Sequence, residues 1–286
     1  MKKVLIILFT LFLLVACSQT KGYSKLTDGS DVIYKKNDKT FTKNDLYEIL
    51  KVSSESSIEN DIITKIANKM DLDLTEANEN AQNEVDYYVS IYGEDTIVYQ
   101  YGSLEAFKAE RLYNYLLDEL TKVYIDENYD KFVKEDKPIE MQVVHFEDSE
   151  SATNLIAQAN QGKDFDTAAE NCGYTESVET KIYLDSNSDL PLEVKNYINA
   201  SFELGVSEII NVENSTTDEN NNTTTTMQYY VVNVINRDVD KEAYILLKKE
   251  YVDIQDTKNY FIEKHDIKFY DQSIYELMKQ SYEVFE

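Results

Sequence analysis

Residues 138–162 read PIEMQVVHFEDSESATNLIAQANQG, a strand pattern followed at once by a helix pattern. After Pro138, apolar and polar residues alternate, and this spacing predicts a strand over residues 139–146. Over residues 149–161, apolar residues recur every three or four positions, which predicts a helix, and Gly162 is suited to end it. A strand followed so closely by a helix indicates a compact α+β unit.

The α+β pattern continues to residue 238. Further elements are expected as helices at 165–171 and 192–202 and as strands at 206–212 and 229–235. Residues 214–226 are rich in Asn and Thr, so we expect a hairpin tip with little regular structure there. We therefore assign the α+β domain to residues 139–238.

Both flanks of this domain have helical periodicity. An N-terminal helical lobe is expected over residues 31–137, with a short strand near Val32 and a first helix capped by Thr42. One long helix is expected from Ser103 past Phe132, and residues 240–286 are again helical. Because each flank leaves an apolar stripe uncovered, we expect the C-terminal segment to pack on the N-terminal lobe. The predicted fold class is α+β, with a helical domain built from both chain ends and an inserted α+β domain.

The first seventeen residues form a separate segment. Lys2 and Lys3 precede an apolar run, and the run ends in Leu-Val-Ala-Cys at Cys17. The basic start, the short apolar run and the cysteine at its end resemble the cleavage and lipidation signal of bacterial lipoproteins. This predicts a signal peptide at 1–17, a tether at 18–30 and acyl chains such as palmitate on Cys17, holding the protein on the outer face of the cell membrane. The alternative is a plain secretory signal with a chance cysteine.

Composition excludes several classes of function. The chain has 28 Lys and Arg against 54 Asp and Glu, a formal net charge of −26, so nucleic acid is not an expected partner. If Cys17 is lipidated, Cys172 is alone and forms no disulfide within the chain. The two histidines, His145 and His265, lie far apart and belong to no metal-binding motif. We expect neither a metal nor a cofactor.

Four segments in order resemble the PrsA-type extracytoplasmic foldases, lipoproteins with a parvulin domain set between helical lobes. The resemblance is carried by KTFTKNDLY at 39–47, SATNLIAQANQGKDFDTAA at 151–169, ASFELGVSEI at 200–209 and the tail from Lys248 to Glu286. It implies that residues 139–238 are a parvulin-like domain.

The resemblance also places a candidate peptide-binding pocket. Parvulins line their proline pocket with two strand histidines, a cysteine or aspartate, and a phenylalanine, and the matching positions here carry other side chains. His145 lies two residues beyond the first of them, on the same strand face. The candidate pocket residues are Val143, His145, Thr175, Tyr197, Phe202 and Tyr230. Without the two histidines, the resemblance assigns no catalytic residue.

These observations lead to one expected function and two alternatives. The resemblance implies a membrane-anchored foldase or chaperone for newly secreted or unfolded proteins, similar to a peptidyl-prolyl isomerase but weak or inactive in catalysis. One alternative is an active parvulin-type isomerase with an altered pocket. The other is a non-enzymatic surface lipoprotein that binds one protein partner. Tyrosine is abundant, with 23 residues, and could supply a surface that contacts unfolded chains.

Overall fold

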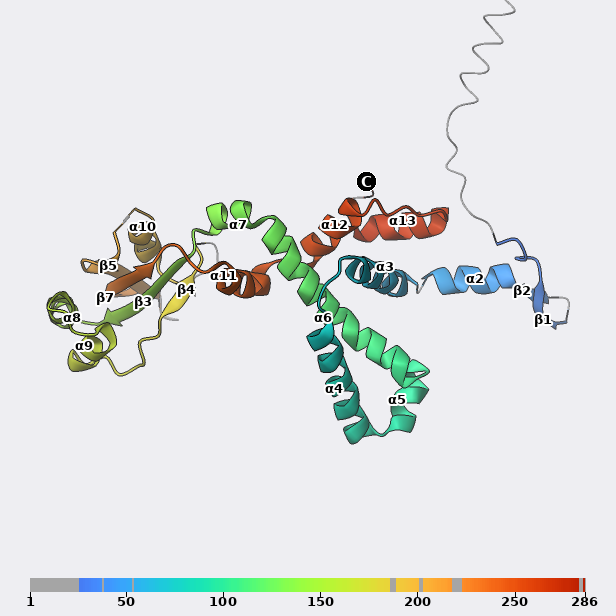
Figure 1. The fold of residues 1–286 in the computed structure, drawn as a ribbon, viewed down its shortest axis with the longest axis horizontal. Coiled ribbons are helices and arrows are strands. Elements are labelled where there is room, and N and C mark those ends of the chain that lie inside the picture. Colours follow the sequence, from blue (N-terminus) through green and yellow to red (C-terminus); the bar gives the residue numbers. More distant parts are fainter. Residues whose placement is uncertain are drawn as a thin grey trace, which may run out of the picture. The chain divides into compact units, whose positions relative to one another are not determined.

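The chain folds into two compact units. The computed structural model describes residues 26–37, 39–52, 54–185, 189–200, 203–217, 223–282 and 285. Unit 1 contains the described residues up to Thr121 together with those from Asp253 onward, and unit 2 contains residues 122–252. Helices and antiparallel strands both occur, so the predicted α+β class is confirmed (Figure 1).

Unit 1 is mainly helical. Its elements are β1 (Val32–Lys36), β2 (Lys39–Thr42), α2 (Lys43–Val52), α3 (Glu55–Lys69), α4 (Thr75–Tyr92), α5 (Glu94–Tyr101), the greater part of α6 (Leu104–Glu127), α12 (Ile254–Lys264) and α13 (Gln272–Ser281). The predicted cap of α2 is confirmed, because the Asp45 N–H donates to Thr42 Oγ1 at 3.3 Å and the Thr42 N–H donates to the Asp45 carboxylate at 2.7 Å. This reciprocal pair satisfies backbone donors that the first helical turn leaves unbonded.

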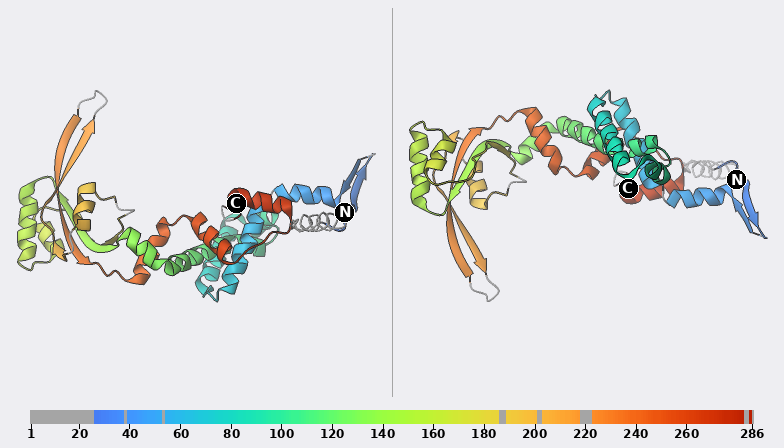
Figure 2. Two further views of the ribbon diagram at one scale, coloured as in Figure 1. Left: turned by 90° about the horizontal axis from the view of Figure 1, so that it is seen from above. Right: turned by 90° about the horizontal axis from the view of Figure 1, so that it is seen from below.

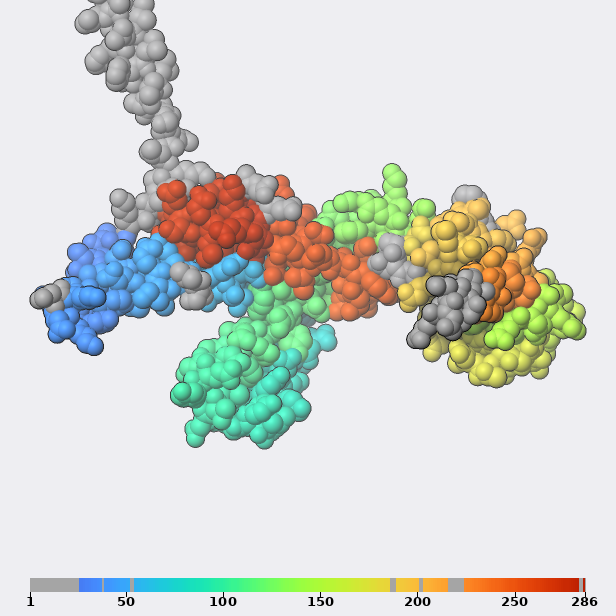
Figure 3. All heavy atoms as spheres, turned by 180° about the vertical axis from the view of Figure 1, so that it is seen from behind, coloured from blue at the N-terminus to red at the C-terminus, as the bar shows by residue number. Residues whose placement is uncertain are grey.

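Three helices of unit 1 share a small core of their own. Val85, Ile97 and Phe107 are buried together and join α4, α5 and the start of α6. Gly93 and Gly102 separate these helices with φ of +81° and +84°, a left-handed region that suits glycine. The three helices form one lobe, teal to green in Figure 3.

The two chain ends meet inside unit 1. The Glu59 carboxylate on α3 accepts hydrogen bonds from the hydroxyls of Tyr113 and Tyr282 and pairs with the Lys258 ammonium at 2.6 Å. Thr121 and Thr257, both buried, lie 3.2 Å apart between their hydroxyl oxygens. The C-terminal segment thus packs on helices from the first half of the chain.

Unit 2 is built around an antiparallel sheet with the strand order β4-β3-β7-β5, in which β6 also pairs with β7. The strands are β3 (Ile139–Phe146), β4 (Lys181–Tyr183), β5 (Gly205–Val206), β6 (Ile210–Thr217) and β7 (Thr223–Asn236). The helices are the end of α6, α7 (Tyr129–Asp136), α8 (Ser149–Asn160), α9 (Phe165–Asn171), α10 (Leu192–Ala200), α11 (Lys241–Lys248) and the 3₁₀ turn η1 (Lys249–Tyr251).

Each face of this sheet is covered by different helices. Val144 and Phe146 on β3 pack with Leu155 of α8 and Phe165 of α9. Met141 on the opposite face packs with Val194 of α10. The alternation read from residues 139–146 therefore assigns successive side chains to two separate cores, as the period of a strand requires.

The structure differs from three sequence expectations. Residues 214–217 and 223–226 are strand residues of the long β6–β7 hairpin, because cross-strand pairing such as Asn214 with Thr226 extends the ladder past the sheet (Figure 2). The expected long helix breaks at Asn128, whose side chain donates to the Tyr124 carbonyl. The expected strand over 206–212 is divided between β5 and the start of β6, since Gly205 and Val206 pair with β7 separately from Ile210 onward.

The division into units also differs from the boundaries drawn from sequence near residues 138 and 239. Residues 122–137 and 240–252 group with the sheet. The reason is a hydrophobic cluster in which Ile125 of α6, Phe132 of α7 and Tyr244 of α11 pack with Leu184.

Glu59→Ala is expected to lower the free energy of unfolding by about 3 kcal/mol, because three donors lose their acceptor in a largely buried site. Burial raises the pKa of Glu59, but Lys258 and the two tyrosine hydroxyls outweigh burial and lower it below 4.5. The stabilisation is therefore present above pH 4.5 and lost as pH falls through the lowered value. Urea unfolding at several pH values measures it.

The matched control is Asp61→Ala, on the same helix, whose exposed carboxylate pairs with Lys65. An exposed pair contributes at most about 1 kcal/mol. Equal losses in the two variants would contradict the role assigned to Glu59.

Candidate functional site

Two of the predicted pocket residues are direct neighbours on adjacent strands. His145 on β3 lies opposite Tyr230 on β7 in the sheet register. Their rings are stacked, with centroids 5.2 Å apart and an angle of 23° between planes. Tyr174 meets the His145 ring edge-on, with centroids 6.3 Å apart. All three side chains are half-buried. Together they form an aromatic ladder near the C-terminal end of β3.

Val143 and Tyr197 lie next to this ladder on the face covered by α10. Both are half-buried against the core that contains Met141 and Val232. The Tyr197 hydroxyl oxygen accepts a hydrogen bond from the Glu208 N–H at 3.3 Å, so the ring is tied to the segment between β5 and β6. The family resemblance therefore grouped Val143 of β3, Tyr197 of α10 and Tyr230 of β7, which all pack against the core on one face of the sheet.

The remaining predicted positions do not add to this group. Thr175 is exposed and lies in the segment after α9, next to Tyr174, whose ring makes the contact with His145. Phe202 and Cys17 lie outside the described residues. Sequence reasoning missed Tyr174, although a tyrosine adjacent to an aligned pocket position was a signal that could have found it.

Protonation in this region favours neutral groups. Burial raises the pKa of the Tyr230 hydroxyl, and burial together with nearby Glu176 raises the pKa of Tyr174. Burial also raises the pKa of the Cys172 thiol, whose sulfur accepts from the Gln158 amide at 3.2 Å. A thiol with a raised pKa is a poor nucleophile at neutral pH. The site therefore offers apolar and aromatic contact rather than an activated nucleophile.

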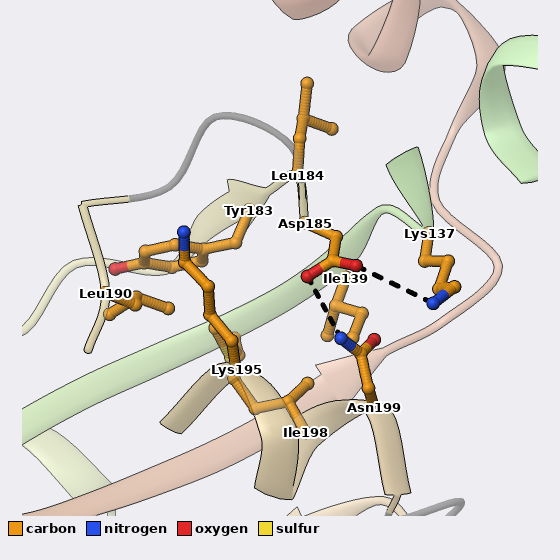
Figure 4. Close-up of a pocket in the computed structure, with 10 residues that line it drawn as sticks. Lys137, Ile139, Tyr183, Leu184, Asp185, Leu190, Lys195, Ile198 and Asn199 are labelled. Atoms are coloured by element: carbon orange, nitrogen blue, oxygen red, sulfur yellow. Dashed lines mark hydrogen bonds and ion pairs between the residues drawn. The ribbon is translucent and has the colours of Figure 1, made fainter. Parts of the chain in front are cut away.

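A small pocket opens on the same sheet face near the start of β3. Its floor is apolar, with Ile139 and Ile198, and Tyr183 and Leu190 stand at its side (Figure 4). Its polar wall is already engaged, because the Asp185 carboxylate accepts from the Asn199 amide at 3.0 Å and pairs with Lys137 at 3.6 Å. The polar groups on this wall thus hold the loop after β4 against α10.

The described residues include neither a cluster of metal-binding side chains nor a helix that could span a membrane. They contain no group of three or more His, Cys, Asp or Glu side chains placed to hold a metal ion. None of their helices combines the length and apolar character needed to cross a bilayer.

No family model matches the sequence, and no curated protein matches it. Solved structures similar to it include the foldase protein PrsA from Streptococcus pneumoniae, which is 20% identical in sequence. The match covers 88% of this chain and 100% of the PrsA chain, with a TM-score of 0.39. The peptidylprolyl isomerase PrsA from Bacillus cereus is 14% identical, with 88% and 99% coverage and a TM-score of 0.41.

A more distant likeness is to one of two SurA-like chaperones from Campylobacter jejuni, 13% identical, with 78% and 84% coverage and a TM-score of 0.20. The structures from Streptococcus pneumoniae and Bacillus cereus both bear the name PrsA, the name of the family that the sequence motifs resemble.

Proposed function

We propose that this protein is an extracytoplasmic chaperone of the foldase type that binds unfolded segments of newly secreted proteins. The observation that carries the proposal is a group of exposed aromatic side chains on the lobe of α4, α5 and α6. Tyr87 and Tyr92 on α4 are 61% and 57% exposed, and Tyr99 on α5 is 94% exposed. Tyr88 contacts both Tyr87 and Tyr92, with ring centroids 5.7 and 6.0 Å apart.

This surface suits weak, unspecific contact with apolar chain segments. Tyr provides a large, rigid contact area at low entropic cost. Covering the exposed part of one such ring gives roughly 2 kcal/mol, so several rings must act together to hold a client. The small core of Val85, Ile97 and Phe107 fixes the helices that carry the rings.

The acidic composition supports the same role. A net charge of −26 makes copies of the chain repel one another, which limits self-association through the exposed tyrosines. Tyr113 and Tyr115, in contrast, donate hydrogen bonds to Glu59 and Glu84 and are half-buried. The tyrosines of the helical lobe are therefore of two kinds, and those at the end of α4 and on α5 are the ones available to a client.

The triple variant Tyr87→Ser, Tyr92→Ser and Tyr99→Ser is expected to lose at least about half of the suppression of aggregation shown by the wild-type chain, because three contact rings are removed. Light scattering of two unrelated unfolding clients, at matched concentrations of chaperone, measures it.

The matched control is Tyr34→Ser with Tyr270→Ser, since these tyrosines are 55% and 64% exposed elsewhere in unit 1. If the wild-type chain protects neither client, a chaperone role is excluded and a binder of one defined partner is favoured.

The sheet face of unit 2 supports a degenerate parvulin domain with little catalysis. Prolyl isomerisation requires groups that stabilise the twisted amide more than the planar one. Val143 occupies the aligned position of the first strand histidine, Tyr230 that of the last, and His145 is the single histidine between residues 122 and 252.

Turnover of a proline peptide is accordingly expected near the uncatalysed rate, and His145→Ala is expected to leave it unchanged. A protease-free isomerisation assay with an intact parvulin as positive control measures both. Turnover comparable with that control, and reduced in the His145→Ala variant, would reverse this part of the proposal in favour of an active isomerase with an altered pocket.

We also propose that Cys17 carries the lipid that holds the protein on the outer face of the membrane. The sequence supports this, because a basic start and an apolar run precede the cysteine. In bacterial cells fed an alkyne analogue of palmitate, the wild-type chain is expected to be labelled and the Cys17→Ser variant to lose the label. Cys172→Ser is the matched control, and labelling that persists in Cys17→Ser argues against the anchor.

A further inference from the structure

The edge of the unit 2 sheet at β4 borders a groove that neither the aromatic ladder nor the Tyr surface uses. The groove has a volume of about 770 Å³. This is within the roughly 300–1,000 Å³ of pockets that hold bound ligands. The residues of β4 line it, together with residues from β3, from the segment before α10, and from α11 and η1.

The strand inside the groove is available for pairing. β4 pairs with β3 through Ile139 to Met141, and it is the terminal strand in the described sheet order (Figure 1). Its residues line the groove, and no other strand of the described residues pairs with its outer edge. An unpaired strand edge is a template for a further strand, and an extended peptide uses its own main chain to complete the ladder.

Apolar side chains flank both faces of this edge. Ile182 and Leu247 pack at the border of the cluster formed by α6, α7 and α11, while Tyr183 and Leu190 pack on the α10 side. Tyr251 of η1 lines the same groove and is 50% exposed. A strand added to β4 would therefore meet apolar contacts on each of its two faces.

Charge further defines the occupant. Glu140 and Asp189 line the groove, and its lysine, Lys181, is paired with Glu179 at 2.8 Å. The uncompensated charge is negative, so basic side chains on a bound peptide gain favourable interactions and acidic ones are repelled.

We propose that the β4 groove binds an extended apolar segment with basic residues, which adds to the sheet as an antiparallel or parallel strand. The proposal rests on the proposed chaperone function and gives it a second mode of contact, main-chain pairing, in addition to the Tyr surface. Main-chain pairing recognises any extended chain, whereas the apolar walls and the acidic rim set the preference.

The test uses a fluorescein-labelled peptide of alternating valine and lysine, the purified full chain and fluorescence anisotropy. Methylating alternate backbone nitrogens of the peptide is expected to weaken binding at least about tenfold, because the main-chain hydrogen bonds are lost. Replacing its lysines by glutamates is expected to weaken binding as well. Equal affinity of the methylated peptide overturns strand addition.

Two readouts place the peptide on the protein. Tyr251→Ser is expected to weaken binding about fivefold or more, while Tyr270→Ser, at a tyrosine of unit 1 that is 64% exposed, leaves it unchanged. Hydrogen exchange at residues 179–184 is expected to slow when the peptide binds, because β4 gains a partner. Protection elsewhere, with none in these residues, overturns the proposal even if Tyr251→Ser alters affinity.

The aggregation assay separates this proposal from the chaperone function. Suppression of aggregation without peptide binding at β4 leaves the chaperone function standing and overturns the groove. Peptide binding that protects residues 179–184, in a chain that suppresses no aggregation, supports the groove and overturns the chaperone function.

Discussion

The carboxylate of Asp136 is almost wholly buried, and it accepts a hydrogen bond from the Tyr244 hydroxyl at 2.6 Å and pairs with the Lys248 ammonium at 2.8 Å. Asp136 ends α7 just before the sheet, and the other two lie on α11 just after it. A buried charge is tolerated only with such partners, so these contacts hold together α7 and α11, the helices on either side of the sheet. β3 and β7, the first and last long strands between these two helices, are themselves neighbours in the sheet, and their register brings His145 opposite Tyr230.

In unit 1, Glu59 is likewise a largely buried carboxylate with hydrogen-bond and ion-pair partners from distant parts of the sequence. Its carboxylate joins α3 to Tyr113, Lys258 and Tyr282, from the first half of the chain and from its end. Asp136 and the largely buried Glu59 thus each join segments that lie far apart in the sequence, Asp136 within unit 2 and Glu59 within unit 1. The surfaces assigned to clients lie outside both centres, on α4 and α5 and along β4, where side chains remain exposed without cost to the buried ion pairs.

The proposed modes of contact differ in physical character. The tyrosines of α4 and α5 offer area without direction, which suits many apolar segments. The β4 edge offers directional main-chain donors and acceptors, which suit any extended chain whatever its sequence. The aromatic ladder of His145, Tyr174 and Tyr230 lies on a sheet whose two faces are otherwise packed by α8, α9 and α10, and its neutral hydroxyls fit contact better than proton transfer.

Local sequence signals were sufficient for most individual elements. The helix at 165–171 and the strand at 139–146 were predicted with the bounds that the structure has, because capping residues and side-chain period act within a few residues. The position of Val143, His145 and Tyr230 on one sheet face followed from the family resemblance. Tertiary structure alone decided the pairing of Asn214 with Thr226 and the groove beside β4, where Tyr183 of β4 and Leu247 of α11, far apart in the sequence, line the same groove. Those features depend on residues distant in sequence, and no local pattern specifies which of many apolar or polar partners will meet.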